Sequence, residues 1–307
     1  MLLLQQMIAF FIFMFIGYYM RKRQIVDDRG CSSISWIVAN AANPALIISS
    51  ALNAEEIFPV SDVLFFLGWG IAVYAFLLLF SFLIPVLLRV PRAQIGTYRN
   101  FTVFSNVGFM GYPLISAMLG SQAVLCASIF TMPFNFLLYT FCIQNFNRER
   151  SDGEGRKFRV RDFFSVGILA SFIALALNFL RPELPRFVQT TITNLANLTA
   201  ALSMITIGMF LARMDLKELF GDLRLLLMAA LKMLVLPIAG ILILRLFIQD
   251  EMLLTVAMII LATPVASMVA ILAEQSGGDS SLATRGVALT TVLSVVTIPL
   301  VSVLLKM

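Results

Sequence analysis

The sequence predicts an all-α membrane protein whose helices cross the bilayer about ten times. Of the 307 residues, 60% are hydrophobic and only 13% are charged, and the mean hydropathy is +0.94. This composition lies far from that of soluble domains. Long apolar runs also recur between short charged or Gly/Pro-rich interruptions, and roughly 20 apolar residues span the bilayer core. Little of the chain is left for a soluble domain.

The predicted spanning segments follow one another closely. They cover residues 2–20, 31–52, 62–88, 100–119, 122–144, 163–180, 188–211, 223–248, 252–274 and 282–305. We expect the first to be an uncleaved helix, because Arg21, Lys22 and Arg23 follow its apolar run. A signal peptide carries its positive charge before that run.

Basic residues concentrate in alternate loops. The loops at 21–30, 89–99, 145–162 and 212–224 hold four, three, six and three Lys or Arg, while those at 53–61 and 120–121 hold none. Basic loops face the cytoplasm by the positive-inside rule. We therefore expect a multi-pass protein of the plasma (inner) membrane with both termini outside the cytoplasm. The net charge of +5 reflects these loops and does not indicate a nucleic-acid partner.

Five segments per half require the second half to be inverted if it repeats the first. Residues 1–144 would form one five-helix repeat, 145–162 a cytoplasmic linker, and 163–307 the inverted repeat. Prolines recur at corresponding segments of the halves, and Gly208 occupies the segment that corresponds to that of Pro44. The proline pairs are Pro85 with Pro237, Pro113 with Pro264, and Pro133 with Pro299.

Two of these segments are interrupted near the middle, by SNVGFMGYP at Ser105–Pro113 and LATPVASM at Leu261–Met268. Proline and glycine free backbone groups, which need polar partners in hydrocarbon. An unwound helix would present N–H groups suited to a carboxylate and carbonyls suited to a cation. Alternatively, small residues make these segments kinks that pack against neighbouring helices.

The candidate binding residues are polar or small residues of the two breaks, with one asparagine from the fifth segment. They are Ser105, Asn106, Gly108, Gly111, Tyr112, Pro113, Asn135, Thr263, Pro264 and Ser267. Glu274 and Gln275 follow the second break and form either an ion-coupling site or an exposed helix end. Lys232 is the one basic residue well inside a segment, so its ammonium should either meet a partner or snorkel to the cytoplasmic face, and we favour snorkelling.

Several classes of function are disfavoured. The chain has no histidine, and Cys31, Cys126 and Cys142 lack metal-ligand spacing, so catalysis by imidazole and a zinc site are excluded. No nucleotide-binding loop is present. We therefore expect neither an enzyme nor a cofactor. The absence of Asp from segment centres weakens a cation/proton antiporter and favours an anionic substrate. Asn40, Asn43 and Thr290 either line a cavity or bridge helices.

The segments SNVGFMGYPL, ITIGMFLA, LATPVASMVAILAEQSGGD and TTVLSVVTIPL resemble the auxin efflux carrier family, over essentially the whole chain. The resemblance implies two inverted five-helix repeats with broken fourth and ninth helices that cross, as in bile-acid symporters and sodium–proton antiporters. It implies a scaffold of helices 1, 2, 6 and 7 and a transport domain of helices 3–5 and 8–10, and it allows a homodimer.

Family motifs are matched residue by residue. Asn106, Gly111 and Pro113 match the first crossover, and Thr263, Pro264 and Ser267 match the second. Asn135 matches a polar position of the fifth helix, and Glu274 lies in a bacterial-type AEQ motif that is more basic in plant members. Bacterial members similar to this chain look like permeases for malate and malonate. Plant relatives export auxin and often carry a long central loop that this chain lacks.

These observations predict a secondary transporter that moves a small organic anion by elevator-type alternating access at the crossover. The substrate would be a dicarboxylate such as malate or malonate, or an auxin-like weak acid, with a proton or sodium as a possible coupling ion. One alternative is a sodium-coupled organic anion symporter of the bile-acid type. Another is a membrane receptor without flux.

Overall fold

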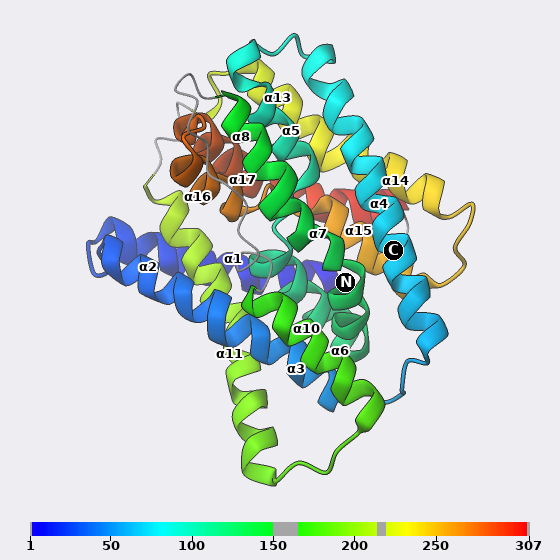
Figure 1. Ribbon diagram of the computed structural model, residues 1–307. Helices are drawn as coiled ribbons and strands as arrows, with labels where there is room; N and C mark the ends of the chain where they lie inside the picture. The colour runs from blue at the N-terminus through cyan, green and yellow to red at the C-terminus, as the bar shows by residue number, and fades with distance from the viewer. Residues whose placement is uncertain (1, 150–164, 214–218, 306–307) are drawn as a thin grey trace.

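The computed structural model describes residues 2–149, 165–213 and 219–305, and this part of the chain is helical (Figure 1). The single β pairing within it is an isolated antiparallel bridge between Ser105 and Val265. The prediction of an all-α protein is therefore confirmed. Most of the predicted linker at 145–162 lies outside the described residues.

The first half contains twelve helical elements in chain order. They are α1 (Leu2–Lys22), α2 (Asp28–Ile37), η1 (Val38–Ala42), α3 (Asn43–Leu52), α4 (Val60–Leu87), η2 (Arg92–Gln94), α5 (Ile95–Val103), η3 (Val107–Gly111), α6 (Tyr112–Phe130), α7 (Met132–Leu137), η4 (Leu138–Cys142) and α8 (Ile143–Glu149). The elements η1, η3 and η4 are short π-helices within longer helical runs, and η2 is a single 3₁₀ turn.

The second half is described from residue 165 onward, apart from 214–218. Its elements are α10 (Val166–Leu180), α11 (Arg186–Leu211), α13 (Leu223–Ala230), the π-helix η5 (Leu231–Val235), α14 (Leu236–Leu244), α15 (Glu251–Ala262), α16 (Ser267–Ser276) and α17 (Ser280–Leu305).

Six described helical stretches are long and apolar enough to cross a bilayer. They are Asp28–Leu52, Val60–Leu87, Val107–Phe130, Arg186–Leu211, Leu223–Leu244 and Ser280–Leu305. Of these, Val107–Phe130 turns at Gly120, whose φ of +77° favours glycine, so two helices meet there. That turn coincides with the predicted boundary between the fourth and fifth segments. The count of ten segments and their inversion stay predictions.

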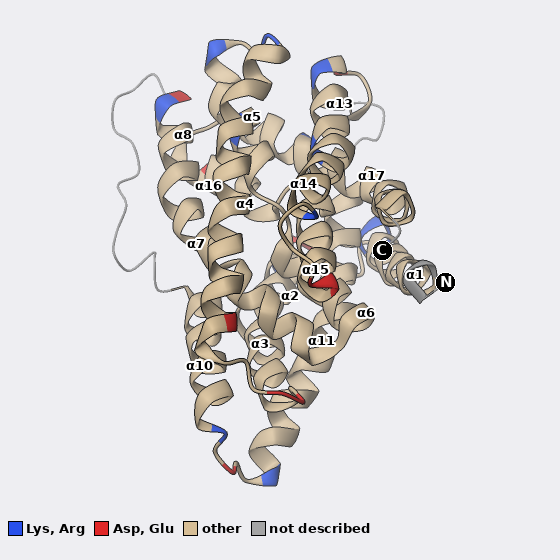
Figure 2. Cartoon of the chain, turned by 90° about the vertical axis from the view of Figure 1, so that its right-hand side faces the viewer, with Lys and Arg blue, Asp and Glu red and all other residues tan. Residues whose placement is uncertain are grey.

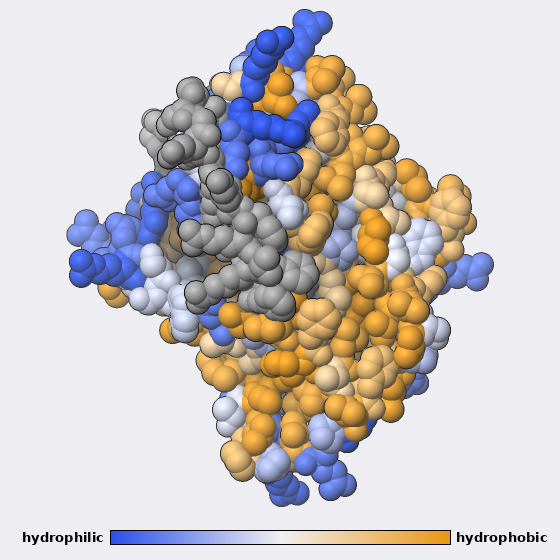
Figure 3. Space-filling model, viewed as in Figure 1, coloured by the Kyte–Doolittle hydropathy of each residue, from blue (hydrophilic) through white to orange (hydrophobic). Residues whose placement is uncertain are grey.

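The surface suits a lipid environment. Large apolar side chains are exposed on the helices, among them Phe15 (67%), Leu79 (70%) and Val86 (74%). Hydrophobic residues cover most of the face in Figure 3, with hydrophilic residues at its margins. Lys and Arg gather at the upper end of Figure 2, near the ends of α5, α8 and α13, and a smaller group lies at the lower end. An apolar belt between charged ends is typical of a membrane-spanning protein.

Short polar side chains fix where several helices begin. An oxygen of Asp27 accepts a hydrogen bond from the Gly30 amide at the start of α2, and Asp250 does the same for Leu253 in α15. Ser165, Asp222 and Asp279 accept equivalent bonds at the starts of α10, α13 and α17. Each bond satisfies an amide that has no acceptor within its helix.

Three prolines directly follow π-helical turns. Pro44, Pro113 and Pro237 are each the second residue of a helix that continues from η1, η3 or η5. In each case the residue before proline donates its N–H to the carbonyl five residues earlier. Proline has no N–H and its ring collides with the carbonyl four residues before it, so a wider turn relieves the clash.

Helices α1, α3, α10 and α11 pack together, with α1 against α11 and α3 against both α10 and α11. Gly17 and Gly208 make the contact between α1 and α11 close, because a Cβ at either would collide with a carbonyl oxygen of the other helix, Ile205 or Met14. Small residues permit such close approach in membranes. Helix α11 continues through Gly208 to Leu211 without a break.

Helix α2 packs against α11 of this set, and the other helices form a second set. Helix α4 packs against α5 and α6, α5 against α8, α6 against α15, α15 against α14 and α17, and α16 against α17. The two sets meet chiefly where α3 contacts α6. This second set contains both broken helices.

Candidate functional site

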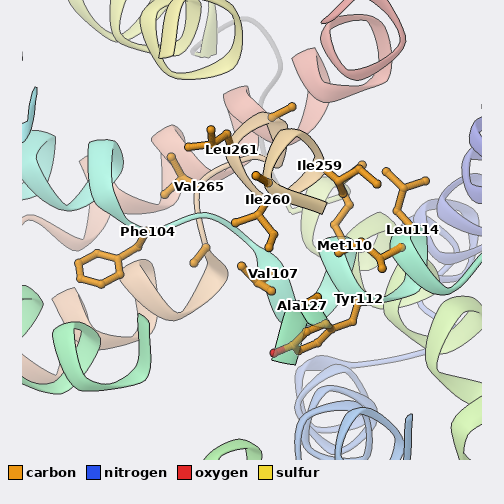
Figure 4. Packing of buried hydrophobic residues seen from close by; sticks show 14 of the residues in the cluster. Phe104, Val107, Met110, Tyr112, Leu114, Ala127, Ile259, Ile260, Leu261 and Val265 are labelled. Carbon is orange, nitrogen blue, oxygen red and sulfur yellow. The ribbon is translucent and has the colours of Figure 1, made fainter. Parts of the chain in front are cut away.

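The two breaks lie against each other. Helix α5 ends at Val103 and α15 ends at Ala262, and the chain continues from each in extended conformation before η3 and α16 begin. The backbone amide of Asn106 donates to the Pro264 carbonyl at 2.7 Å, and the backbone amide of Ala266 donates to the Phe104 carbonyl at 2.9 Å. Figure 4 shows Phe104 and Val265 on these crossing segments. We call residues 104–106 and 263–266 the crossover.

The helices next to the crossover provide partners for two more of its polar groups. The Val265 amide donates to the Thr290 hydroxyl of α17 at 3.1 Å, and the Thr263 hydroxyl donates to the Ile260 carbonyl at 2.8 Å. Thr290 therefore bridges two helices, as one of the two interpretations of the polar residues expects. Buried backbone groups need such partners in hydrocarbon.

Lys232 of η5 also contacts the crossover. Its side chain is fully buried, and the ammonium donates to the Ser105 hydroxyl at 2.7 Å and to the Thr102 carbonyl at 3.2 Å. The prediction that Lys232 snorkels is wrong. The Thr102 carbonyl lies in the last turn of α5, where carbonyls have no N–H donor within the helix. This carbonyl therefore accepts from the ammonium and holds it in the interior.

A cavity of about 290 Å³ extends from the crossover to the first turn of α10. Six predicted binding residues line it: Ser105, Asn106, Gly108, Tyr112, Asn135 and Ser267. The walls also carry Asn40, Asn43 and Thr131, and the aromatic rings of Phe109, Phe134 and Tyr139. Among the lining residues, which are all in the described part, no side chain is charged.

Two polar atoms at this cavity are buried without a hydrogen-bond partner. The Asn106 side-chain oxygen accepts from the Phe109 amide, which caps η3 and leaves the amide nitrogen Nδ2 unpartnered. The side-chain oxygen of Asn43 is likewise unpartnered. A buried polar group without a partner is costly, so each is a candidate contact for a ligand.

Two helix N-termini also meet the cavity. Val107, Gly108 and Phe109 begin the run of η3 and α6, and Ser267 and Met268 begin α16. The first amides of a helix have no acceptor within it, and they lie at the positive end of the helix dipole. The Val107 and Phe109 amides already donate to Ser105 and Asn106, so the amides of Gly108, Ser267 and Met268, with the Asn106 side-chain nitrogen Nδ2, are the candidate donors to an anion.

The other predicted residues lie elsewhere. Gly111, Pro113, Thr263 and Pro264 shape the two breaks and are not among the lining residues. Glu274 is exposed and lines a second cavity of about 180 Å³ with Arg213 of the chain segment after α11. Gln275 is also exposed, at the same end of α16. The structure therefore does not bring Glu274 and Gln275 to the crossover.

Sequence reasoning gave no site role to several lining residues, including Phe109, Thr131 and Tyr139. The Thr131 hydroxyl hydrogen-bonds the Tyr112 hydroxyl at 2.8 Å and thereby positions a predicted residue. These residues resemble ordinary membrane-helix residues in sequence. Only the packing of α7 against α10, and of η3 against η1 and α11, turns them toward one cavity.

The opposite side of the crossover is closely packed. Met110 and Leu114 of the first broken helix lie near Ile259 and Ile260 of the second (Figure 4), and all four are at most 1% exposed. Because apolar side chains fill this side, the cavity ends at the crossover.

The fold and site define a multi-pass helical membrane protein with a polar cavity at two crossed, broken helices. A family model described as "Membrane transport protein" matches residues 2–302, and the chain belongs to this family. The resemblance to the auxin efflux carriers is thereby confirmed.

Two relatives match nearly the whole chain. A Methanothermobacter thermautotrophicus protein named "Uncharacterized transporter" is 24% identical, over 98% of this chain and 98% of its own length. A Rhizobium meliloti protein named "Putative malonate transporter" is 26% identical, over 95% of this chain and 92% of its own length.

Proposed function

We propose that the protein is a secondary transporter of a small organic anion, whose carboxylate binds in the cavity at the crossover. The single observation that carries this proposal is the side-chain amide nitrogen Nδ2 of Asn106, which is buried at the cavity without a hydrogen-bond partner. A carboxylate oxygen would accept its hydrogen bond. The amides that begin α16 and η3 would supply further donors and a favourable dipole.

The chemistry of the cavity favours an organic anion over a metal or sodium ion. Its described lining residues include no carboxylate, and hard cations are held by carboxylate, carbonyl and water oxygens. The aromatic rings and the Asn43 oxygen suit the apolar and polar remainder of an organic acid. The relative named for malonate makes short dicarboxylic acids the first substrates to test.

Alternating access follows from the asymmetry of the crossover. The cavity ends at the first turn of α10, directly after the basic linker, which we expect to face the cytoplasm. The other side is packed by residues such as Met110 and Ile259. In our proposal, the set that contains the broken helices moves against α1, α3, α10 and α11 as an elevator, and exposes the site to the opposite side.

Uptake into liposomes tests this function. Purified protein is reconstituted, and radiolabelled malonate, malate and an aromatic weak acid are offered under a proton gradient, a sodium gradient or neither. We expect saturable uptake of at least one acid that depends on the protein. No uptake or exchange of any of them under all three conditions would contradict the proposal.

The same assay separates the alternatives. Strict dependence on sodium would favour a symporter of the bile-acid type. Saturable binding without flux in either direction would favour a receptor. Empty liposomes and liposomes that contain the Asn106→Ala variant serve as controls for leakage and for transport outside the crossover.

A further inference from the structure

The buried ammonium of Lys232 has no carboxylate partner among the described residues. The described ion pairs involve Arg21, Arg213 and Asp28, at the ends of α1, α2 and α11, and none involves Lys232. Its hydrogen bonds go to two neutral oxygens, of Ser105 and Thr102. An unpaired charge in this position is expensive unless another charge comes to offset it.

The Ser105 hydroxyl connects this charge to the cavity. Its oxygen accepts from Lys232 at 2.7 Å, and Ser105 is also one of the lining residues. The hydrogen bonds of the described residues give the hydroxyl proton no acceptor. A hydroxyl that accepts from an ammonium is polarised and becomes a stronger donor. The proton of Ser105 is therefore available to a ligand oxygen.

Ser105 and Asn106 together offer two adjacent donors. The Asn106 amide nitrogen is unpartnered, and both residues line the same cavity. A carboxylate has two oxygens and suits two neighbouring donors. The described lining residues carry no charge themselves, and Lys232 brings a formal positive charge into direct contact with one of them, Ser105.

We propose that the Lys232 ammonium, acting through the Ser105 hydroxyl, selects the charge of the substrate, so that the cavity takes an organic acid with one negative charge. This inference rests on the proposed function. A second carboxyl group on the ligand would be bound protonated, and an amide or hydroxyl in its place would also donate to the unpartnered side-chain oxygen of Asn43. A dianion would leave one charge buried without a partner.

A series of three nearly isosteric compounds tests the inference. Malonate, malonamate and malonamide differ mainly in charge, because malonamate carries one negative charge and malonamide none. Each is used to compete with radiolabelled malonate for uptake by wild-type protein. Just below neutral pH, where most malonate is a dianion and the remaining monoanion carries the uptake, we expect malonamate to compete at least as well as unlabelled malonate and malonamide to fail.

The Lys232→Met variant removes the charge and keeps an apolar side chain of similar length. We expect it to lose about tenfold of the preference for malonamate over malonamide, the size of one charge-assisted hydrogen bond. Lys22→Met, at the exposed end of α1, is the matched control and should keep the wild-type preference. If Lys232→Met does not fold, Ser105→Ala decides the question, because it retains the lysine and removes the connecting hydroxyl.

The outcomes separate this inference from the proposed function. If the wild type takes up malonate and Lys232→Met keeps the full preference for malonamate over malonamide, the inference alone is overturned. If Lys232→Met does not fold, an unchanged preference in Ser105→Ala has the same consequence. A wild-type protein that takes up malonate just below neutral pH and does not bind malonamate would do the same. If the wild type transports no carboxylate at all, both the proposed function and the inference fall.

Discussion

At the scale of single residues, the two ends of the Asn106 amide have different roles. The oxygen caps η3 by accepting from the Phe109 amide, which fixes the orientation of the side chain. The nitrogen is thereby directed away from that amide and stays unpartnered beside the cavity. A helix cap thus positions the donor that we propose for the substrate.

We predict that Asn106→Ala raises KM for the transported acid by about tenfold or more, because a hydrogen bond to a charged group contributes about 1.5–3 kcal/mol. Asn106→Asp should impair uptake further, since it places a like charge near the carboxylate. Initial uptake rates in liposomes measure both effects. Asn53→Ala, at the end of α3 and away from the cavity, is the matched control. Equal KM values for Asn106→Ala and wild type would contradict the assignment.

Residue types predicted the site only where the sequence itself is unusual. The clustered Ser, Asn, Gly and Pro of the fourth segment pointed to Ser105 and Asn106, which line the cavity. The partners of Lys232 were missed because they come from a segment 130 and 127 residues away. Charge and spacing along the chain place the lysine within a segment and led us to expect snorkelling, and only tertiary packing shows that it is buried and what it contacts.

At the scale of elements, the crossover depends on side chains that complete its backbone pairing. Two hydrogen bonds join the broken helices, and Thr290 accepts the Val265 amide at 3.1 Å. The predicted breaks at Ser105–Pro113 and Leu261–Met268 overlap the observed interruptions at 104–106 and 263–266. Pro264 lies in the second interruption, where it removes a helical bond, whereas Gly108, Gly111 and Pro113 lie in the helical elements that follow the first. The fifth segment was predicted to end at residue 144, yet α8 continues to Glu149 and buries Phe146. The polar residues of α8 led us to end the predicted segment before its last turn.

Thr290→Val should destabilise the crossover. It leaves the buried Val265 amide without its acceptor, at a cost of about 1–3 kcal/mol. We expect a lower midpoint of thermal unfolding in detergent, whereas Thr290→Ser, which retains the hydroxyl, should stay close to wild type. Identical midpoints for the Val and Ser variants would show that this hydroxyl does not support the break.

The contact between α1 and α11 gives a second prediction at this scale. Gly208→Leu should destabilise the fold by about 3 kcal/mol or more, because the new side chain would meet the Met14 backbone, which has no room to move. Gly68→Leu in α4 is the matched control, since no atom lies within 4 Å of a Cβ there. Thermal unfolding and gel filtration in detergent measure the difference. A Gly208→Leu protein as stable as Gly68→Leu would contradict the close contact.

At the scale of the whole molecule, charge marks its two ends and links the helices there. Asp28 pairs with Arg21 at 2.6 Å and with Arg213 at 2.7 Å, which joins α1, α2 and the end of α11. The Glu149 carboxylate accepts from the Thr97 amide at 2.7 Å and from its hydroxyl at 2.9 Å, which joins α8 to α5. Burial raises the pKa of Glu149 from 4.5 to about 6, against these hydrogen bonds, which lower it.

This raised pKa predicts the pH dependence of stability. Between pH 4.5 and about 6, the folded protein retains a proton on Glu149 that the unfolded chain has released. The contribution of this carboxyl to the free energy of unfolding is therefore greatest below pH 4.5, falls as the pH rises to about 6, and is constant above that. The midpoint temperature of thermal unfolding should fall less steeply with rising pH over this range for Glu149→Gln than for the wild type. Parallel profiles for the two proteins would contradict the prediction.

The central claim is that the crossover of the two broken helices binds the transported anion. A crystal or cryo-EM structure with the acid selected by the uptake assay tests it most directly. We predict density for the acid beside Ser105 and Asn106, with a carboxylate oxygen within hydrogen-bond distance of the Asn106 amide nitrogen. Density for the acid in the second cavity beside Glu274 and Arg213, with the crossover empty, would contradict the account.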